Sequence, residues 1–559
     1  TNSFKKNKLT TKWKRYSYSF KSDGTPVALI LNASGSSGKI WLDGIQYERG
    51  SKPTEFVCAP LEGRLYTTDP DGNNEYGSKL NAEFAVTGKK GTAGNADFTL
   101  MNFYKNTLWE KKLNVKAGER VKLPFDELKL GPGTYILRVK YEVKGTVPYY
   151  DFYRFCIIKS LNGTHATKDL YACLFDAKDF RTEERLDLMQ RLGFGGSTSY
   201  GPGKACDPMV YELRKKYNIT GYTHTLTGAP HLTAKEKSER HPDYIFCMNI
   251  NSRVWRRPAE RKKIEELEYY SPEVLAKMEK FAEKVAKACP YVRAWSIATE
   301  EEGTIPCLRK RNDFKEFAKL QLAFYRGIKR GNPKAIVMPT GGTSGYGKTR
   351  GKDDIEGYLE ATKGKIKWDA IPIHPYGSID GTLGAGDLDE SIQMLSDSIA
   401  KFGYGKDTPI YLNEGGGGSP AVWGDGPAYH YSGGQPSYDQ GLHEFLHAAK
   451  FARQYIICLK YWPRMPHFNS WQNVDRTVMD MNLTPTSSMF GINTLGHLLA
   501  KPEFIDDIRP AAGMRGYAFK DDKGRGVAAV WCTIDDVENG FIRGPVMRIK
   551  FDGKLPEMF

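Results

Sequence analysis

The sequence predicts a multidomain protein whose largest part is a (β/α)8 barrel, or TIM barrel, preceded by β-sandwich domains and followed by a small β appendage. Three observations support this prediction. Short apolar strands alternate with helices over residues 163–503, strand patterns without helices fill the preceding part, and further strand patterns follow. At 559 residues, the chain also exceeds what one hydrophobic core usually serves.

Residues 1–56 predict strands of a first β-sandwich. "WKRYSYSF" alternates large apolar and polar residues, "PVALILNASG" contains a short apolar strand, and "GKIWLDGIQYERG" gives another strand before a turn. These strands are too few to close a domain, so we expect this stretch to be the C-terminal part of a sandwich that begins further upstream. It resembles the last strands of jelly-roll carbohydrate-binding modules.

Residues 57–162 predict a second sandwich of the immunoglobulin-like type. Strands recur at regular spacing with glycine, proline and asparagine turns between them. They are "KLNAEFAVTG", "ADFTLMNFY", "RVKLPFDEL" and "GTYILRVKYEV". No cluster of titratable residues stands out in this stretch. We therefore expect a supporting domain, with ligand binding as the alternative.

Residues 163–503 contain eight candidate strands that alternate with helices, as a (β/α)8 barrel requires. The candidate strands are "LYACLFD", "GFGGSTS", "ITGYTHT", "RAWSIAT", "AIVMPTG", "DAIPIHPY", "PIYLNE" and "IICLKYW". In the helix "SPEVLAKMEKFAEKVAKACP", Ser271 is suited to cap the N-terminus and Pro272 fits the first turn. The helix "DESIQMLSDSIAKFG" has an apolar stripe and Gly403 as a stop signal. Residues 504–559 predict a C-terminal β segment.

Two of the predicted strands end in glutamate. "AWSIATEEEG" places Glu300 after an apolar stretch, and "IYLNEGGGGS" places Glu414 before four glycines that leave space around it. Because a carboxylate at the end of an apolar strand loses hydration, such a residue indicates a working group. Active sites of these barrels lie at the carboxyl ends of the strands, so the two glutamates are the candidate catalytic pair. The alternative is that each is a solvated loop acid.

The strands that carry these glutamates resemble the fourth and seventh strands of clan A glycoside hydrolases. "WSIATE" resembles the strand of the acid/base, which implies that role for Glu300, with Glu301 as the alternative. "PIYLNE" resembles the nucleophile strand, which implies that role for Glu414. The resemblance therefore implies a retaining hydrolase of β-linked glycans that uses no cofactor or metal. In such enzymes the two carboxyl groups stand about 5 to 5.5 Å apart.

The same resemblance implies several substrate-binding residues. "DAIPIHPYG" resembles the sixth strand, which implies that His374 contacts sugar and that Tyr376 orients the nucleophile. "LKYWPRM" resembles the eighth strand, which implies that Trp462 is a platform on which a sugar ring stacks. Thr299 stands where the clan usually has an asparagine that bonds the 2-hydroxyl group of the sugar. Asn413 precedes the nucleophile and is assigned to substrate binding as well.

The formal charge of +15 favours an acidic partner. Part of the excess lies in "RVWRRPAERKK" around Trp255, after the third predicted strand. Trp423 and Trp471 follow strands seven and eight, where aromatic rings could stack on sugars. These features predict a polysaccharide or oligosaccharide substrate, sulfated or uronic, rather than nucleic acid. The alternatives are a solvated basic face and tryptophans that pack within loops.

Two motifs compete with this interpretation. "HEFLH" places His443, Glu444 and His447 at the spacing of zinc peptidases. No glutamate follows between residues 445 and 502 to complete the zinc site, and His467 could do so only in an unusual arrangement. "GTSGYGKT" matches a nucleotide-binding loop, but clustered charge follows where a helix should begin. A zinc peptidase and a carbohydrate-binding barrel without catalysis remain the alternative functions.

The cellular location is predicted only indirectly. The sequence contains no apolar run as long as a membrane span. The nine cysteines contain no C-x-x-C pair, which argues against a zinc ribbon, and their odd number argues against a disulfide scaffold. The expected glycan substrate and the sandwich domains favour a secreted, periplasmic or cell-surface protein.

Overall fold

The computed structural model describes the greater part of the chain after residue 58. The described residues are 12, 14–17, 52, 55, 59–103, 106–162, 165–174, 182–199, 208–223, 271–296, 313–339, 350–373, 388–415, 440–470, 485, 487–509 and 514–532. The predicted strands of residues 1–56 lie almost entirely outside them.

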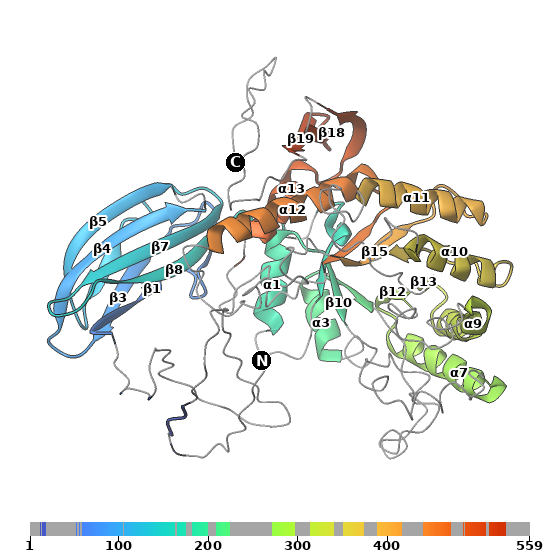
Figure 1. The fold of residues 1–559 in the computed structure, drawn as a ribbon, viewed down its shortest axis with the longest axis horizontal. Helices are drawn as coiled ribbons and strands as arrows, with labels where there is room; N and C mark the ends of the chain where they lie inside the picture. Colours follow the sequence, from blue (N-terminus) through green and yellow to red (C-terminus); the bar gives the residue numbers. More distant parts are fainter. Residues whose placement is uncertain are drawn as a thin grey trace.

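Eight strands form a two-sheet sandwich, at the left of Figure 1. One sheet has the order β1 (Leu61–Tyr66), β3 (Ala82–Gly88), β6 (Arg120–Leu123). The other has the order β2 (Asn73–Glu75), β8 (Tyr149–Ile158), β7 (Gly133–Glu142), β4 (Ala93–Asn102), β5 (Thr107–Lys116). Neighbours are antiparallel except β2 and β8, which are parallel.

The core of the sandwich comes from the alternation that the sequence shows. Alternate residues of β3 and β7 are buried, as expected of strands with one face toward a core. Phe84 of one sheet meets Phe98 of the other edge to face, with ring centroids 5.2 Å apart. Such a contact adds to the stabilisation from burial alone.

An α/β part follows, in which strands and helices alternate from η1 (Lys168–Leu170) to α13. Its strands are β9 (Tyr171–Leu174), β10 (Gly196–Ser199), β11 (Thr220–Thr223), β12 (Val292–Ser296), β13 (Ile336–Met338), β14 (Ile371–Ile373), β15 (Ile410–Gly415) and β16 (His467–Ser470). Its helices are α1 (Thr182–Leu192), α3 (Pro208–Lys216), α7 (Pro272–Ala288), α9 (Phe314–Gly331), α10 (Arg350–Thr362), α11 (Leu388–Lys401), α12 (Gln440–Lys460) and α13 (Ser487–Leu498).

The eight strands of this part form one parallel sheet in which the first strand pairs with the last. The order is β13-β12-β11-β10-β9-β16-β15-β14, so β9 lies between β10 and β16. The two ends of this order also meet. The amide of Asp369, just before β14, donates to the carbonyl of Val337 in β13 at 3.2 Å, and the amide of Val337 donates to the Asp369 carboxylate at 2.7 Å.

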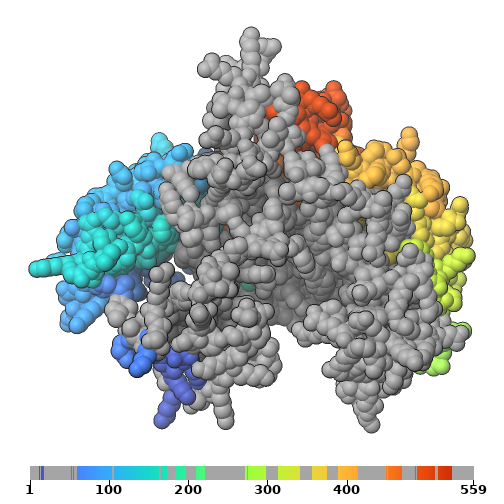
Figure 2. All heavy atoms as spheres, viewed as in Figure 1, coloured from blue at the N-terminus to red at the C-terminus, as the bar shows by residue number. Residues whose placement is uncertain are grey.

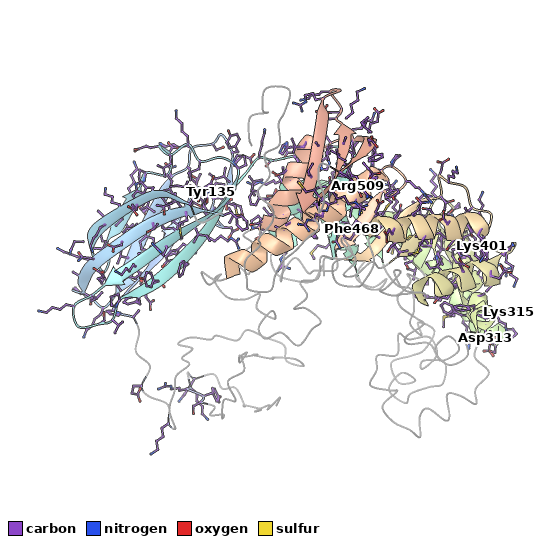
Figure 3. All side chains as sticks on the ribbon, turned by 45° about the horizontal axis from the view of Figure 1, so that its top comes forward. Tyr135, Asp313, Lys315, Lys401, Phe468 and Arg509 are labelled. Atoms are coloured by element: carbon purple, nitrogen blue, oxygen red, sulfur yellow. The ribbon has the colours of Figure 1, made fainter. Side chains whose placement is uncertain are left out.

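Several helices match the sequence prediction. The helix predicted after Ser271 is α7, which begins at Pro272. In α11, the predicted stripe residues Ile392, Leu395 and Ile399 are buried, and Gly403 follows the helix with a φ of 85° that favours glycine. Helix α9 begins after Asp313, whose carboxylate accepts from the amide of Glu316 and caps the helix; Asp313 stands at the right of Figure 3.

The prediction for the eighth strand is wrong. Residues 456–460 of "IICLKYW" are the last turns of α12, and the eighth strand is β16, seven residues further on. A continuous apolar run does not distinguish a buried strand from a buried helix by periodicity. Here the buried residues include Phe451 and Tyr455, which precede the run at helical spacing. Phe468 of β16 lies at the centre of the α/β part in Figure 3.

The C-terminal described residues form a three-stranded antiparallel sheet of β17 (Glu503–Ile508), β18 (Met514–Lys520) and β19 (Gly526–Cys532). A cluster of charged and polar side chains connects this sheet to α11 and α12. Lys460 of α12 lies 3.0 Å from the carboxylate of Asp389 in α11 and 3.1 Å from that of Asp507 in β17. The hydroxyl of Tyr517 donates to Asp389 at 3.1 Å. Figure 2 shows this sheet, in red, at the surface.

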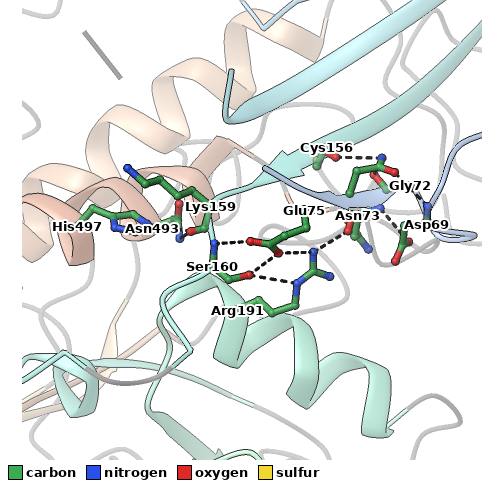
Figure 4. Close-up of polar contacts among 11 residues, drawn as sticks. Asp69, Gly72, Asn73, Glu75, Cys156, Lys159, Ser160, Arg191, Asn493 and His497 are labelled. Atoms are coloured by element: carbon green, nitrogen blue, oxygen red, sulfur yellow. Dashed lines mark hydrogen bonds and ion pairs between the residues drawn. The ribbon is translucent and has the colours of Figure 1, made fainter. Parts of the chain in front are cut away.

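The sandwich is joined to the α/β part by hydrogen bonds that Figure 4 shows in close-up. Arg191 of α1 donates to the carbonyl of Asn73 at 2.7 Å and pairs with the carboxylate of Glu75 at 3.2 Å. The hydroxyl of Ser160 donates to the same carboxylate at 2.6 Å. The Arg191 side chain is only 17% exposed and that of Glu75 is 41% exposed, so the pair is shielded from solvent mainly on the arginine side.

A second set of contacts connects the end of the sandwich to α13. The carbonyl of Lys159 accepts from the side-chain amide nitrogen of Asn493 at 3.0 Å and from Nε2 of His497 at 2.8 Å. The buried thiol of Cys156 lies 3.6 Å from the carbonyl of Pro485. Together, the two sets of contacts hold the sandwich against two different helices.

Candidate active site

The carboxyl end of β15 carries the proposed nucleophile and an irregularity in the sheet. On the ladder with β16, Leu412 pairs with Phe468 and Gly415 pairs with Ser470. Between these pairs, β15 contributes two residues, Asn413 and Glu414, where β16 contributes one. This two-against-one count is that of a β-bulge, a feature that redirects side chains and is frequent beside active sites.

The bulge was not predictable from the sequence, and it points to a further residue. Asn469 is the single residue of β16 opposite the bulge, and it also pairs with Ala172 of β9. It therefore stands beside Asn413 and Glu414 at the same edge of the sheet. The irregular register between β15 and β16 identifies Asn469 as a site candidate. This register depends on the pairing of two strands that are distant in sequence.

The strand that precedes the other proposed glutamate ends at the same edge of the sheet. Glu300 lies four residues beyond the end of β12 and is outside the described residues. Because all eight strands are parallel, the carboxyl ends of β12 and β15 face the same side of the sheet. Ala294 of β12, Met338 of β13, Tyr411 of β15 and Ala370, the residue before β14, form a separate buried cluster.

The opposite edge, where the strands begin, is occupied by a polar cluster. His467, the first residue of β16, is 1% exposed, and its Nδ1 lies 3.3 Å from the carbonyl of Asp169. Arg293 of β12 forms an ion pair with the Asp169 carboxylate at 2.7 Å. Burial, reinforced by the positive charge of Arg293, lowers the pKa of His467 to about 3, so the ring is neutral.

This location removes His467 as a third ligand for the zinc alternative. His443 and His447 belong to the first turns of α12, which begins after the carboxyl end of β15. His467 begins the strand that follows the far end of this helix, which is 21 residues or roughly 30 Å long. Among the described residues, no group of three or more histidine, cysteine, aspartate or glutamate side chains could hold a metal ion.

The predicted role of Trp462 also needs correction. Trp462 was assigned to the end of an eighth strand, but it lies in the turn between α12 and β16. This turn precedes the strand, so Trp462 stands at the edge where strands begin, away from the carboxyl ends. The basis for a sugar-stacking role is therefore lost.

The remaining predicted site residues lie outside the described residues. They are Thr299, His374, Tyr376, Trp255, Trp423 and Trp471. Their roles stay predictions. His374 directly follows β14, as its assignment to the end of the sixth strand requires.

Comparison with known proteins supports the fold. No protein-family model matches the chain, and no curated protein sequence matches it. Among solved structures, a family 39 glycoside hydrolase from Bacteroides cellulosilyticus WH2 matches 82% of this chain and 87% of its own, with a TM-score of 0.53 and 14% identity. The chain is therefore similar in fold to that hydrolase.

Two further structures overlap more loosely. A β-glucuronidase from Bacteroides uniformis has a TM-score of 0.37 at 11% identity, with 84% of this chain and 60% of that chain covered. A glucosidase from Croceicoccus marinus has a TM-score of 0.41 at 12% identity, with 64% and 76% covered.

Proposed function

We propose that the protein is a retaining glycoside hydrolase of β-linked glycans, built on a closed (β/α)8 barrel. The similarity in fold to a family 39 glycoside hydrolase supports this proposal. The observation that carries it is the β-bulge at Asn413 and Glu414, at the carboxyl end of β15. The contact of Val337 with Asp369 supports closure of the sheet between β13 and β14.

In the proposed mechanism, the two glutamates act in turn on the anomeric carbon. Glu414 attacks this carbon while Glu300 donates a proton to the departing oxygen, so the glycosidic bond breaks as an ester to Glu414 forms. Glu300, now ionised, then removes a proton from water. The water oxygen attacks the anomeric carbon and releases Glu414 with the original configuration restored. This chemistry uses no cofactor.

The proposed substrate is an anionic polysaccharide or oligosaccharide, sulfated or uronic. The formal charge of +15 and the basic stretch around Trp255 support this choice, because arginine binds such groups through two parallel hydrogen bonds. We also propose an extracytoplasmic location. Cys289, the residue after α7, is disulfide-bonded. Disulfides persist mainly in oxidising compartments, so this bond favours a location outside the cytoplasm. Within the described part, no helix combines the length and apolarity of a membrane span.

The test is product release from a panel of neutral, sulfated and uronic polysaccharides. We expect wild type to release products that keep the anomeric configuration, as seen by NMR early in the reaction. Glu414→Gln should abolish release, because the amide cannot attack the anomeric carbon. Glu444→Gln is the matched control, since it alters the zinc motif alone, and it should leave release unchanged, as should a chelator.

A second experiment separates Glu300 from Glu301. Azide needs no general base to attack the intermediate, so it should restore turnover to an acid/base variant on a substrate with a good leaving group. We expect azide to restore turnover to Glu300→Ala. Glu301→Ala should retain its activity without azide. Release that persists in Glu414→Gln, or that a chelator abolishes, would refute the two-glutamate mechanism.

A further inference from the structure

The outer face of the three-stranded sheet of the sandwich carries a group of cations around one exposed aromatic ring. Residues of β1, β3 and β6 alternate between the core and this outer face. On the outer side, Arg64, Ala85 and Arg120 form one row across the sheet. Tyr66, Glu83 and Lys122 form the next row. We call Arg64, Tyr66, Arg120 and Lys122 the basic face.

Tyr66 organises the two arginines of this face. Its ring lies 5.0 Å from the guanidinium carbon of Arg64 and 5.4 Å from that of Arg120. The small side chain of Ala85 stands between the two arginines in the register and leaves room for both. A guanidinium that stacks on an aromatic ring keeps the N–H groups at its edge available, and these bind carboxylate and sulfate through paired hydrogen bonds.

The charges on this face do not cancel within the described residues. Arg120 forms an ion pair with Glu83 of β3. Within the described part of the chain, no ion pair involves Arg64 or Lys122. Glu62 lies one row further along the sheet, opposite Thr87. The basic face therefore offers two cations that form no ion pair among the described residues, on two different strands, beside a ring that is 37% exposed.

The spacing of these two cations favours a polymer over a single small anion. Arg64 belongs to β1 and Lys122 to β6, and β3 lies between the two strands. Adjacent strands are about 4.8 Å apart, so the backbones of β1 and β6 are roughly 10 Å apart. Successive anionic groups along an extended chain can each pair with a different cation, so a polymer gains a contact at both positions.

The basic face is also fixed relative to the α/β part. Thr67 follows Tyr66 directly, and its hydroxyl oxygen accepts from the side-chain amide of Asn74 at 3.2 Å. The neighbouring residue Asn73 accepts from Arg191 of α1 at 2.7 Å. These contacts run from β1 through β2 to the first helix, so a chain bound at the basic face keeps a constant position relative to the barrel.

We propose that the basic face is a second glycan-binding site, which holds the carboxylate or sulfate groups of a long anionic polysaccharide while another part of the same chain is cleaved. This inference rests on the proposed function, which identifies the substrate as an anionic polysaccharide. Binding itself does not depend on catalysis. Recognition requires repeated anions on an extended chain, so short oligosaccharides that fill only the cleavage site gain nothing from it.

The test uses the full chain with Glu414→Gln, so that the polysaccharide is not consumed, and measures retardation in gels that contain a sulfated, a uronic or a neutral polysaccharide. We expect retardation by at least one anionic polymer and none by the neutral one. Arg64→Gln combined with Lys122→Gln should weaken this binding at least tenfold and reduce its salt dependence. Lys89→Gln combined with Lys90→Gln removes the same charge from a nearby turn and should have little effect.

Tyr66→Ala should weaken binding less than the double charge variant, because both arginines remain. Equal thermal unfolding midpoints would show that the variants are folded. Equal loss in the Lys89 and Lys90 control, or unchanged binding in the Arg64 and Lys122 variant, would overturn the proposal. Retention of an acidic protein together with failure to bind any anionic polysaccharide would overturn it as well. Failure of hydrolysis alone would overturn the proposed function and leave the binding result standing.

Discussion

His165 lies between β8 of the sandwich and η1 of the α/β part in the sequence, and its burial predicts a specific loss of stability in mild acid. Its Nε2 lies 2.8 Å from the carbonyl of Gly193 and therefore carries the proton of the neutral ring. Its Nδ1 lies 3.0 Å from the hydroxyl of Thr167. Burial lowers the pKa of this histidine from 6.5 to about 4, against the opposing effect of the hydrogen bond to Gly193.

The magnitude follows from the difference between the folded and unfolded pKa values. Above pH 6.5 the ring is neutral in both states, so its contribution to stability is fully present. As the pH falls from 6.5 toward 4, only the unfolded chain takes up the proton, and the free energy of unfolding decreases. At pH 5 the loss is about 2 kcal/mol, from 1.5 pH units below the unfolded pKa at about 1.36 kcal/mol per unit.

Urea unfolding of wild type and His165→Gln at pH 7 and pH 5, followed by tryptophan fluorescence, measures this loss. Glutamine cannot titrate, so the variant should lose about 2 kcal/mol less than wild type between the two pH values. His467, whose folded pKa is about 3, is present in both proteins and cancels from the difference. Equal losses in the two proteins, or a smaller loss in wild type, would refute the reasoning.

Two further predictions concern packing and oxidation. A Cβ added at Gly327 of α9 would lie 2.2 Å from the carbonyl of Glu279 in α7, so Gly327→Ala should lower the free energy of unfolding by about 1 to 3 kcal/mol. Gly405→Ala, where the nearest atom is 4.0 Å away, is the control in the same urea titration, and an equal effect of both would contradict the packing argument. Cys289 should resist alkylation in denatured, unreduced protein and react after reduction, whereas the free Cys458 should react before it, as mass spectrometry of peptides can show. Alkylation of Cys289 without reductant would exclude the disulfide.

The sequence predicted the elements whose pattern is local. Seven of the eight proposed barrel strands overlap an observed strand, because each lies in the short stretch between one helical pattern and the next. The eighth failed because the apolar run before Trp462 continues a buried helix. The polar strand β16 that replaces it, "HFNS", carries little strand signal of its own.

The candidate site was predictable only in part. A glutamate at the end of an apolar strand can be recognised in the sequence, and Glu414 was. The bulge beside it could not be, since it arises when Leu412 and Gly415 of β15 are matched to Phe468 and Ser470 of β16. Register between distant strands is a property of the folded sheet. Asn469 was missed for the same reason.

The contacts of Arg191, Lys159 and Glu75 bear on how this protein can be divided. An α/β part produced without the sandwich would leave the guanidinium of Arg191 without its carboxylate and the side chains of Asn493 and His497 without their shared acceptor. Partly buried polar groups that lose their partners destabilise what remains. The two parts are therefore poor modules for exchange or separate production, and this joint is a constraint that any shortened version of the protein would have to redesign.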